Sequence, residues 1–161
     1  MFSLSQTTGY AIKALTCIAG GCEVRQIQDI ADCTDIPVSY LAKVVHRLGK
    51  AGVLESKRGN KGGVWLTRNP DDLSLLEISK AVDGEDQFTS CLLGLENCSD
   101  ARACPTHDFW KASRSAIRQT LANTSLADVL IFEKSRSEKG SSSAFSPVSR
   151  SETPSETPSP Q

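Results

Sequence analysis

The stretch "RQIQDIADCTDIPVSYLAKVVHRLGKAGVL", residues 25–54, is the most informative part of this 161-residue sequence about its fold. It predicts two short amphipathic helices joined by a tight turn. The first helix has Ile27, Ile30 and Ala31 on one face, which is the spacing of a helix with one buried side. Asp35 and Pro37 in "TDIP" end this helix, because both residues favour turn geometry.

The second helix of the pair begins near Pro37 and ends at "GKAG". Its apolar positions recur at helical spacing and form the expected buried face: Leu41, Val44, Val45 and Leu48. The opposite face is polar and basic: Ser39, Tyr40, Lys43, Arg47 and Lys50.

The next segment, "VLESKRGNKGGVWLT" at residues 53–67, predicts a β-hairpin with a glycine-rich tip. A helix over 5–19 precedes the helix pair, with Ile12, Leu15 and Ile18 in an apolar stripe. Helix, short helix, turn, helix and hairpin, in this order, define a winged helix-turn-helix. We therefore expect a mainly α fold with a small β-hairpin as its wing.

Two further helices are predicted after the hairpin. Ser74 and Glu77 have the spacing of a capping box at the start of "SLLEISKAVDG", which predicts another helix. Residues 107–124 predict a long C-terminal helix with Trp110, Ile117 and Leu121 in one stripe. We expect this helix to form the interface of a homodimer.

The folded domain is expected to cover residues 1–134, with a short helix over 125–132 as its last element. Beyond it the composition changes to Ser, Pro, Glu and Thr, and "SETP" occurs twice between 151 and 158. Such a sequence has almost no apolar surface to bury against the entropy of ordering the chain. Residues 135–161 are therefore predicted to be a disordered tail.

The net charge of −1 conceals a basic segment followed by an acidic one. Residues 43–68 contain seven basic side chains and the single acid Glu55, whereas residues 71–108 contain nine acids and two basic side chains. A helix-turn-helix places its second helix in the major groove of DNA, and a basic wing can enter the minor groove. The expected DNA contacts are Ser39, Tyr40, Lys43, Arg47, Arg58 and Lys61. A solvated basic face on a packed helical unit is the alternative.

A second candidate site lies in "TSCLLGLENCSDARACPTHDFW", residues 89–110. Cys91, Cys98, Cys104 and His107 fall close together in a loop that leads into a helix. Thiolates bind iron and zinc well, and an imidazole can complete the set. The spacing alone leaves iron–sulfur and zinc open. Of the other three cysteines, Cys17 and Cys33 are expected to be residues that pack. Cys22 falls in the loop after the first helix, and we assign it no role.

No secretory signal and no run of about 20 apolar residues is visible, so a reducing cytoplasm is expected. In that compartment six cysteines are better explained as metal ligands, redox thiols or core residues than as a disulfide framework. Neither His46 nor His107 has a nucleophile–base–acid constellation around it, so the chain is not expected to be an enzyme.

The motifs resemble the Rrf family of winged-helix transcription regulators, which includes IscR- and NsrR-like members. The resemblance runs from about Leu4 to Phe132 and rests on four segments: "TTGYAIKAL", "DIPVSYLAKVVHRLGKAGVLESKRGNKGGVWL", "LEISKAVDG" and "CPTHDFWKASRSAI". It implies that Ser39, Tyr40 and Arg58 touch DNA. Ala42 stands where IscR-like members have a glutamate that tunes base preference, so the operator sequence does not carry over.

The resemblance also favours an iron–sulfur cluster in the cysteine loop over zinc. His107 matches the histidine that serves as fourth ligand in some members, which suits a 2Fe–2S cluster, with 4Fe–4S as the alternative. Other members use an acid from the first helix, where this chain has Gly9. The implied protein is a homodimeric regulator, a repressor in our interpretation, that reads a palindromic duplex operator and senses iron, nitric oxide or redox state. A cluster-free regulator with a zinc site or a thiol/disulfide switch in the same loop is the alternative.

Overall fold

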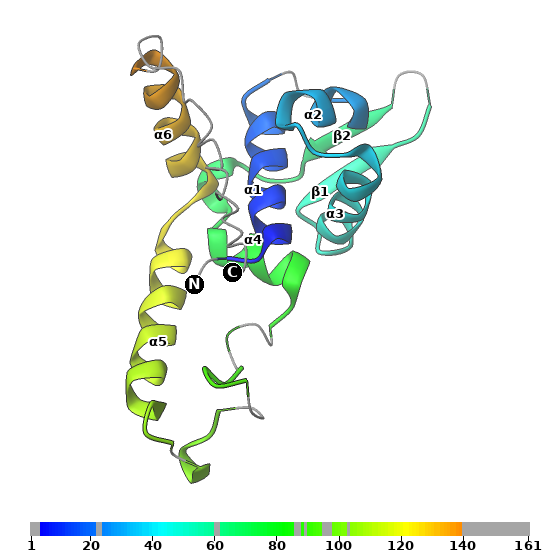
Figure 1. Ribbon diagram of the computed structural model, residues 1–161. Coiled ribbons are helices and arrows are strands. Elements are labelled where there is room, and N and C mark those ends of the chain that lie inside the picture. The colour runs from blue at the N-terminus through cyan, green and yellow to red at the C-terminus, as the bar shows by residue number, and fades with distance from the viewer. Residues whose placement is uncertain are drawn as a thin grey trace, which may run out of the picture.

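The computed structural model describes residues 4–21, 24–59, 62–85, 88, 90–94, 98–102 and 104–139. Its main elements, in chain order, are α1 (Gln6–Ala19), α2 (Ile27–Thr34), α3 (Val38–Lys50), β1 (Leu54–Lys57), β2 (Gly63–Leu66), α4 (Leu75–Asp83), α5 (His107–Asn123) and α6 (Leu126–Lys139). Two short 3₁₀ turns are η1 (Pro70–Asp72) and η3 (Asp100–Arg102). This arrangement confirms the predicted mainly α fold with a two-stranded wing (Figure 1).

Helix α1 lies at the centre of the hydrophobic core. Its residues Ala11, Ala14 and Leu15 are fully buried, and the helix packs against α2, α3, α4, α6 and β2. Ser5 caps its N-terminus, where the hydroxyl accepts a hydrogen bond from the Thr8 N–H at 3.0 Å. Figure 1 shows α1 between the α2–α3 pair and α6. The helix pair is therefore docked on an element that also contacts the C-terminal part of the chain.

The turn between α2 and α3 forms as the sequence predicts. Asp35 has a φ of 55°, in the left-handed region that aspartate tolerates, and this reverses the chain after α2. Ile36 is buried in the turn and Pro37 is the residue before the first turn of α3. The expected inner face of α3 is buried in full: Leu41, Val44, Val45 and Leu48. Its burial fixes which side of α3 faces outward.

The wing is an antiparallel hairpin in which Leu54 pairs with Leu66 and Lys57 with Gly63. Val64 also pairs with Arg25 through two backbone hydrogen bonds of 3.0 and 2.8 Å. The backbone just before α2 therefore lies alongside β2 and pairs with it at this one position. A Cβ on Gly63 would stand 2.7 Å from the Arg25 carbonyl oxygen. Glycine is required there because the two backbones approach so closely.

Helix α4 begins with the predicted capping box. The Ser74 hydroxyl accepts from the Glu77 N–H at 3.2 Å, and the Glu77 carboxylate accepts from the Ser74 N–H at 3.0 Å. Backbone hydrogen bonds join the start of α4 to the start of α6, from the Leu75 N–H to the Thr124 carbonyl and from the Leu126 N–H to the Leu73 carbonyl. The chain therefore leaves the core after α4, and α5 brings it back beside the start of α4. Figure 1 shows α5 extending away from the helical body.

The last helix is longer than expected. Helix α6 continues to Lys139, which places 135–139 in a helix rather than in the predicted tail. The rest of that tail, 140–161, lies outside the described residues. No helix among the residues described is long and apolar enough to cross a membrane.

Candidate DNA interface and cysteine segment

The outer face of α3 presents three exposed polar side chains in one line. Ser39, Lys43 and His46 are all exposed, and their spacing of four and three residues places them on one face of the helix. Ser39 and Lys43 were predicted as DNA contacts. His46 was not among the predicted contacts, although its spacing in the sequence places it on the same exposed face. These side chains can reach base edges and phosphates if α3 enters a major groove.

Two other predicted DNA contacts make contacts within the protein. The Tyr40 side chain is partly buried, its hydroxyl lies 2.9 Å from the Thr7 hydroxyl, and its ring packs edge-on against Tyr10 with centroids 5.2 Å apart. Arg47 donates from Nη1 to the carbonyl oxygen of Val82 at 2.6 Å. Val82 lies in the last turn of α4, where carbonyl groups have no partner within the helix. Tyr40 and Arg47 thus position α3 against α1 and α4.

The described part of the wing carries the exposed basic residues Lys57 and Arg58. Arg58 is exposed and follows β1 directly. It lines a shallow hollow of about 350 Å³ between the hairpin and the start of α2, together with Gln26 and Gln28. Gln26 also donates from Nε2 to the Gly62 carbonyl at 2.9 Å, which ties the hairpin to α2. Lys61, the other predicted wing contact, lies outside the described residues.

The cysteine segment brings together one thiol and the histidine. The Sγ of Cys98 lies 3.3 Å from Nδ1 of His107, the first residue of α5. His107 is 5% exposed, and its Nε2 lies 2.9 Å from Oδ1 of Asp100. With the proton on Nε2, the imidazole donates to Asp100 and directs the lone pair of Nδ1 toward Cys98. Metal-binding histidines commonly have this second hydrogen bond to a carboxylate.

Asp100 is itself held in place by a cation. Lys111 donates from Nζ to Asp100 Oδ1 at 2.7 Å. Lys111 and then His107 hold the pKa of Asp100 below its ordinary value, and Asp100 in turn raises the pKa of Lys111. The carboxylate therefore stays ionised and keeps His107 oriented toward Cys98.

The other two thiols of the segment have separate neighbours. Cys104 Sγ lies 3.3 Å from the Thr106 hydroxyl, and hydrogen bonds from the Thr106 side chain and backbone lower the pKa of this thiol. Cys91 Sγ accepts from the Leu93 N–H at 3.4 Å. All three loop cysteines are free thiols. Within the described part of the chain, no three His, Cys, Asp or Glu side chains are arranged to hold one metal ion.

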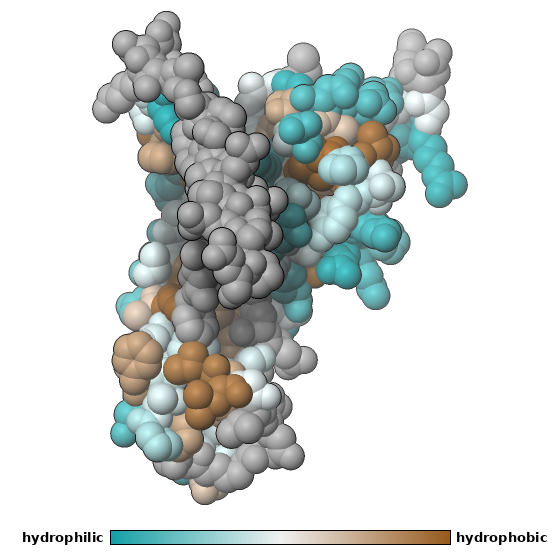
Figure 2. Space-filling model, viewed as in Figure 1, coloured by the Kyte–Doolittle hydropathy of each residue, from teal (hydrophilic) through white to brown (hydrophobic). Residues whose placement is uncertain are grey.

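The segment before α5 folds back along the first turns of that helix. Trp110 donates from Nε1 to the Ser90 carbonyl at 2.8 Å, and Arg114 donates to the Phe88 carbonyl at 3.2 Å. Trp110, which we expected in an interface stripe, is thereby buried at 8% exposure by its own chain. Its neighbour Phe109 is 69% exposed instead. Figure 2 shows apolar side chains gathered on the surface of this part of the molecule.

Two of the remaining cysteines differ from their expected role as separate packing residues. Cys17 of α1 and Cys33 of α2 form a disulfide, with Cα atoms 6.6 Å apart. Cys17 is buried, as expected for a packing residue, whereas Cys33 is exposed. The packing of α1 against α2 brings the two sulfurs together. A separation of 16 residues in the sequence did not indicate this pairing. Cys22 lies outside the described residues.

The winged helix-turn-helix with a basic outer face defines a DNA-binding protein of the transcription-regulator class. The chain belongs to the Rrf2 family, described as iron-dependent transcriptional regulators, whose family model matches residues 4–131. This confirms the resemblance inferred from the motifs, and it confirms that the chain is a regulator and not an enzyme.

Similar proteins include two named regulators. The chain is 32% identical to the HTH-type transcriptional regulator IscR of Aliivibrio salmonicida over 124 residues, which are 76% of this chain and 73% of that protein. It is 28% identical to the HTH-type transcriptional regulator NsrR of Bacillus licheniformis over 131 residues, or 80% and 92% of the two chains. The structure of CymR, the global cysteine regulator of B. subtilis, matches with a TM-score of 0.67 and 25% identity, covering 82% of this chain and 98% of that one.

Proposed function

We propose that this regulator binds its operator under the control of an iron–sulfur cluster held by Cys91, Cys98, Cys104 and His107. The observation that supports this most directly is the buried His107, whose Nδ1 faces Cys98 Sγ at 3.3 Å while Nε2 is bonded to Asp100. Thiolate and imidazole are donor types suited to iron, and the same segment carries three free thiols, of which the structure brings Cys98 to the imidazole. A 2Fe–2S cluster suits this set best, and a 4Fe–4S cluster is the alternative.

The protein's own residues prepare the donors. Asp100, fixed by Lys111, orients His107, and the hydrogen bonds from Thr106 favour the thiolate form of Cys104. When bound, a cluster supplies iron whose oxidation, nitrosylation or loss changes the charge at these donors.

The same segment is attached to α5 through contacts that can transmit such a change. Trp110 donates a hydrogen bond to the Ser90 carbonyl, and Arg114 donates one to the Phe88 carbonyl. A shift of the cysteine segment would therefore move the backbone that contacts the first turns of α5. We propose that α5 forms the interface of a homodimer, in which two α3 helices and two wings read a palindromic operator. A change at α5 would then alter the spacing of the two DNA-reading halves. Repression is the regulatory outcome that we expect.

The test is to compare DNA binding by the same protein with and without the cluster. The DNA is a labelled duplex that the protein itself selects from a random-sequence pool. Protein reconstituted anaerobically with ferrous iron and sulfide is compared with chelator-treated protein by fluorescence anisotropy. We expect the two Kd values to differ by about 5- to 150-fold, the usual range of allosteric coupling.

Two variants sharpen this comparison. Cys98→Ser is expected to abolish the dependence on reconstitution, because a serine oxygen is a harder and far less acidic donor than a thiolate. Ser99→Ala, an exposed neighbour in the same segment, is the matched control and is expected to keep it. Equal Kd values for reconstituted and chelated wild-type protein would overturn the proposed control by a cluster.

A regulator without a cluster, with a zinc site or a thiol/disulfide switch in the same segment, is the second candidate. It is favoured by the lowered pKa of the Cys104 thiol, which raises the fraction of reactive thiolate. Stoichiometric zinc in protein purified anaerobically would support the zinc site. Colourless, metal-free protein whose DNA binding responds to thiol oxidation would support the switch.

A further inference from the structure

A disulfide joins α1 to α2 at a place that neither the DNA interface nor the cysteine segment uses. Cys17 is 8% exposed, whereas the side chain of Cys33 is exposed. Thiol–disulfide exchange requires a thiolate to reach one of the two sulfur atoms in line with the S–S bond. Cys33 is therefore the sulfur open to attack, and Cys17 is the leaving group.

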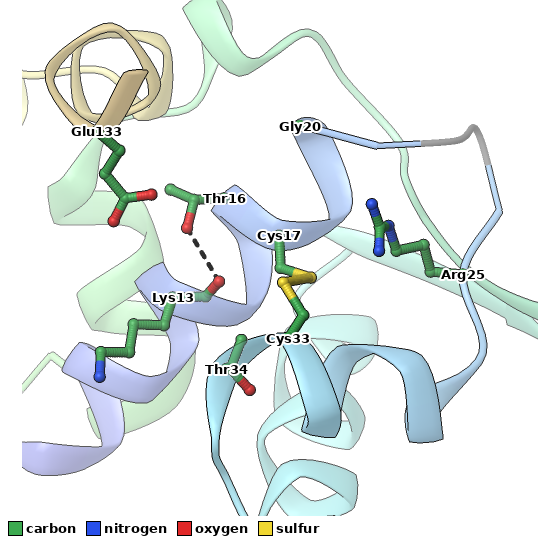
Figure 3. A pocket seen from close by; sticks show the side chains of 8 residues that line it. All are labelled: Lys13, Thr16, Cys17, Gly20, Arg25, Cys33, Thr34 and Glu133. Carbon is green, nitrogen blue, oxygen red and sulfur yellow. Dashed lines mark hydrogen bonds between the residues drawn. A yellow bond between two sulfur atoms is a disulfide. The ribbon is translucent and has the colours of Figure 1, made fainter. Parts of the chain in front are cut away.

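A hollow of about 360 Å³ lies beside this bond (Figure 3). This volume falls in the range of small-molecule sites. Figure 3 shows Lys13 and Arg25 on either side of the disulfide, with Glu133 as the single acid among the described lining residues. The Nε of Arg25 is buried and has no hydrogen-bond partner among the described residues. The hollow thus has two cationic side chains, Lys13 and Arg25, among the residues that line it beside the disulfide.

The disulfide also contributes to holding α2 in place. Of the eight residues of this helix, all within the described part of the chain, only Ile30 and Ala31 are buried. Before the helix, the Gln26 side chain is bonded to the wing at Gly62. Near its end, Cys33 provides a covalent link to α1. A helix with so little buried surface depends more than its neighbours on such a link.

We propose that Cys17–Cys33 is a thiol–disulfide exchange site for anionic low-molecular-weight thiols, and that its opening loosens α2 from α1. Disulfides in reducing compartments are typically transient and redox-sensing, which suits such a role. This site is separate from the cysteine segment and works whether or not a cluster is bound there. Its effect on DNA binding rests on α2 being the first helix of the helix-turn-helix.

The exchange proceeds in two balanced steps. A thiolate RS⁻ attacks Cys33 Sγ, the Cys17–Cys33 bond breaks, and Cys17 leaves as a thiolate that takes a proton from water, which gives Cys33–S–S–R. A second RS⁻ attacks the sulfur of the R group, releases RSSR and frees the Cys33 thiolate, which is then protonated. Two thiols are oxidised to one disulfide, and the protein pair is reduced by two electrons.

Peptide mapping tests the chemistry directly. Trypsin cuts after Arg25 and Lys43, so Cys33 is the only cysteine in peptide 26–43, whereas peptide 14–25 contains Cys17 and Cys22. The oxidised full-length protein is expected to yield these two peptides cross-linked. Reduced glutathione should first place one glutathionyl group on 26–43 and then free both peptides.

Variants identify the partner of Cys33. Cys22→Ser is the matched control and is expected to keep the cross-link, whereas Cys17→Ser should lose it. Treated with oxidised glutathione, which releases one reduced glutathione as the Cys33 thiolate attacks it, Cys17→Ser should retain the mixed disulfide because no Cys17 thiol is present to displace the glutathionyl group. A cross-link that persists in Cys17→Ser and disappears in Cys22→Ser would overturn the assignment. So would oxidised protein in which glutathione never modifies Cys33.

The positive hollow and the loosening of α2 are tested separately. Arg25→Ala should slow the reaction with glutathione several-fold and leave the reaction with neutral 2-mercaptoethanol unchanged. Equal slowing of both reactions would contradict a preference for anionic thiols. Hydrogen exchange of α2 amides should quicken on reduction in wild-type protein and not respond in Cys33→Ser. Unchanged exchange of α2 in reduced wild-type protein would refute the loosening.

Discussion

Arg58 at the wing offers the sharpest test of how this protein meets DNA, and we expect Arg58→Ala to weaken binding and flatten its salt dependence. Arg58 is exposed and has no ion-pair partner among the described residues, so its charge is available to a phosphate. Each phosphate contact contributes about −0.9 to the slope of log affinity against log salt. At about 0.15 M salt, the loss of one contact corresponds to roughly a fivefold weaker affinity, or about 1 kcal/mol.

The measurement is a set of anisotropy titrations of one selected duplex across a range of salt concentrations. Arg68→Ala is the matched control, because it removes the same charge from an exposed residue whose guanidinium already pairs with Glu77 at 3.1 Å. We expect the slope to fall by about 0.9 for Arg58→Ala and to change little for Arg68→Ala. Equal slope changes in both variants would mean a general charge effect and would remove the wing from the interface.

Two further predictions concern the fold that supports this interface. Ser74→Ala removes the N-cap of α4 and should destabilise the protein by about 1 kcal/mol in chemical denaturation. A hydrogen bond from the N–H of Ser74, and a weaker effect of its hydroxyl, hold the pKa of Glu77 below its ordinary value of 4.5. The stabilisation by ionised Glu77 is therefore fully present above that pH, and it is lost as the pH falls through the lowered pKa. The stability gap between wild type and Glu77→Gln should therefore close in acid, and a constant gap would contradict this cause. Gly63→Ala should lower the free energy of unfolding by about 1–3 kcal/mol, because its Cβ would stand 2.7 Å from the Arg25 carbonyl oxygen. Gly9→Ala is the contrasting case: a Cβ on Gly9 meets nothing within 4 Å, and alanine in a helix should stabilise the protein.

The sequence predicts the helix pair, the wing and the capping box because each depends on local patterns. The apolar spacing from Leu41 to Leu48 gave the buried face of α3, and "TDIP" gave the turn. The last helix was predicted to end at 132, because the composition of 135–139 was judged by its capacity to bury apolar surface, whereas α6 continues to Lys139. Glu, Lys and Arg in that stretch are good helix formers even when exposed.

The contacts that sequence could not predict are those between elements. Arg47 was predicted as a DNA contact from its place on a basic face, and the sequence did not indicate that its guanidinium also bonds to the last turn of α4, 35 residues away. The link between Cys17 and Cys33 and the pairing of Cys98 with His107 likewise depend on how helices and segments pack. Donor chemistry is readable in a sequence, whereas the partner that a side chain meets depends on the fold.

The most direct test for the cluster is visible absorption of anaerobically purified wild-type protein, with iron, sulfide and zinc determined on the same sample. We expect a coloured protein with iron and acid-labile sulfide, whose visible absorption is lost in Cys98→Ser and kept in Ser99→Ala. A colourless protein with stoichiometric zinc, or one with no metal at all, would contradict the iron–sulfur assignment.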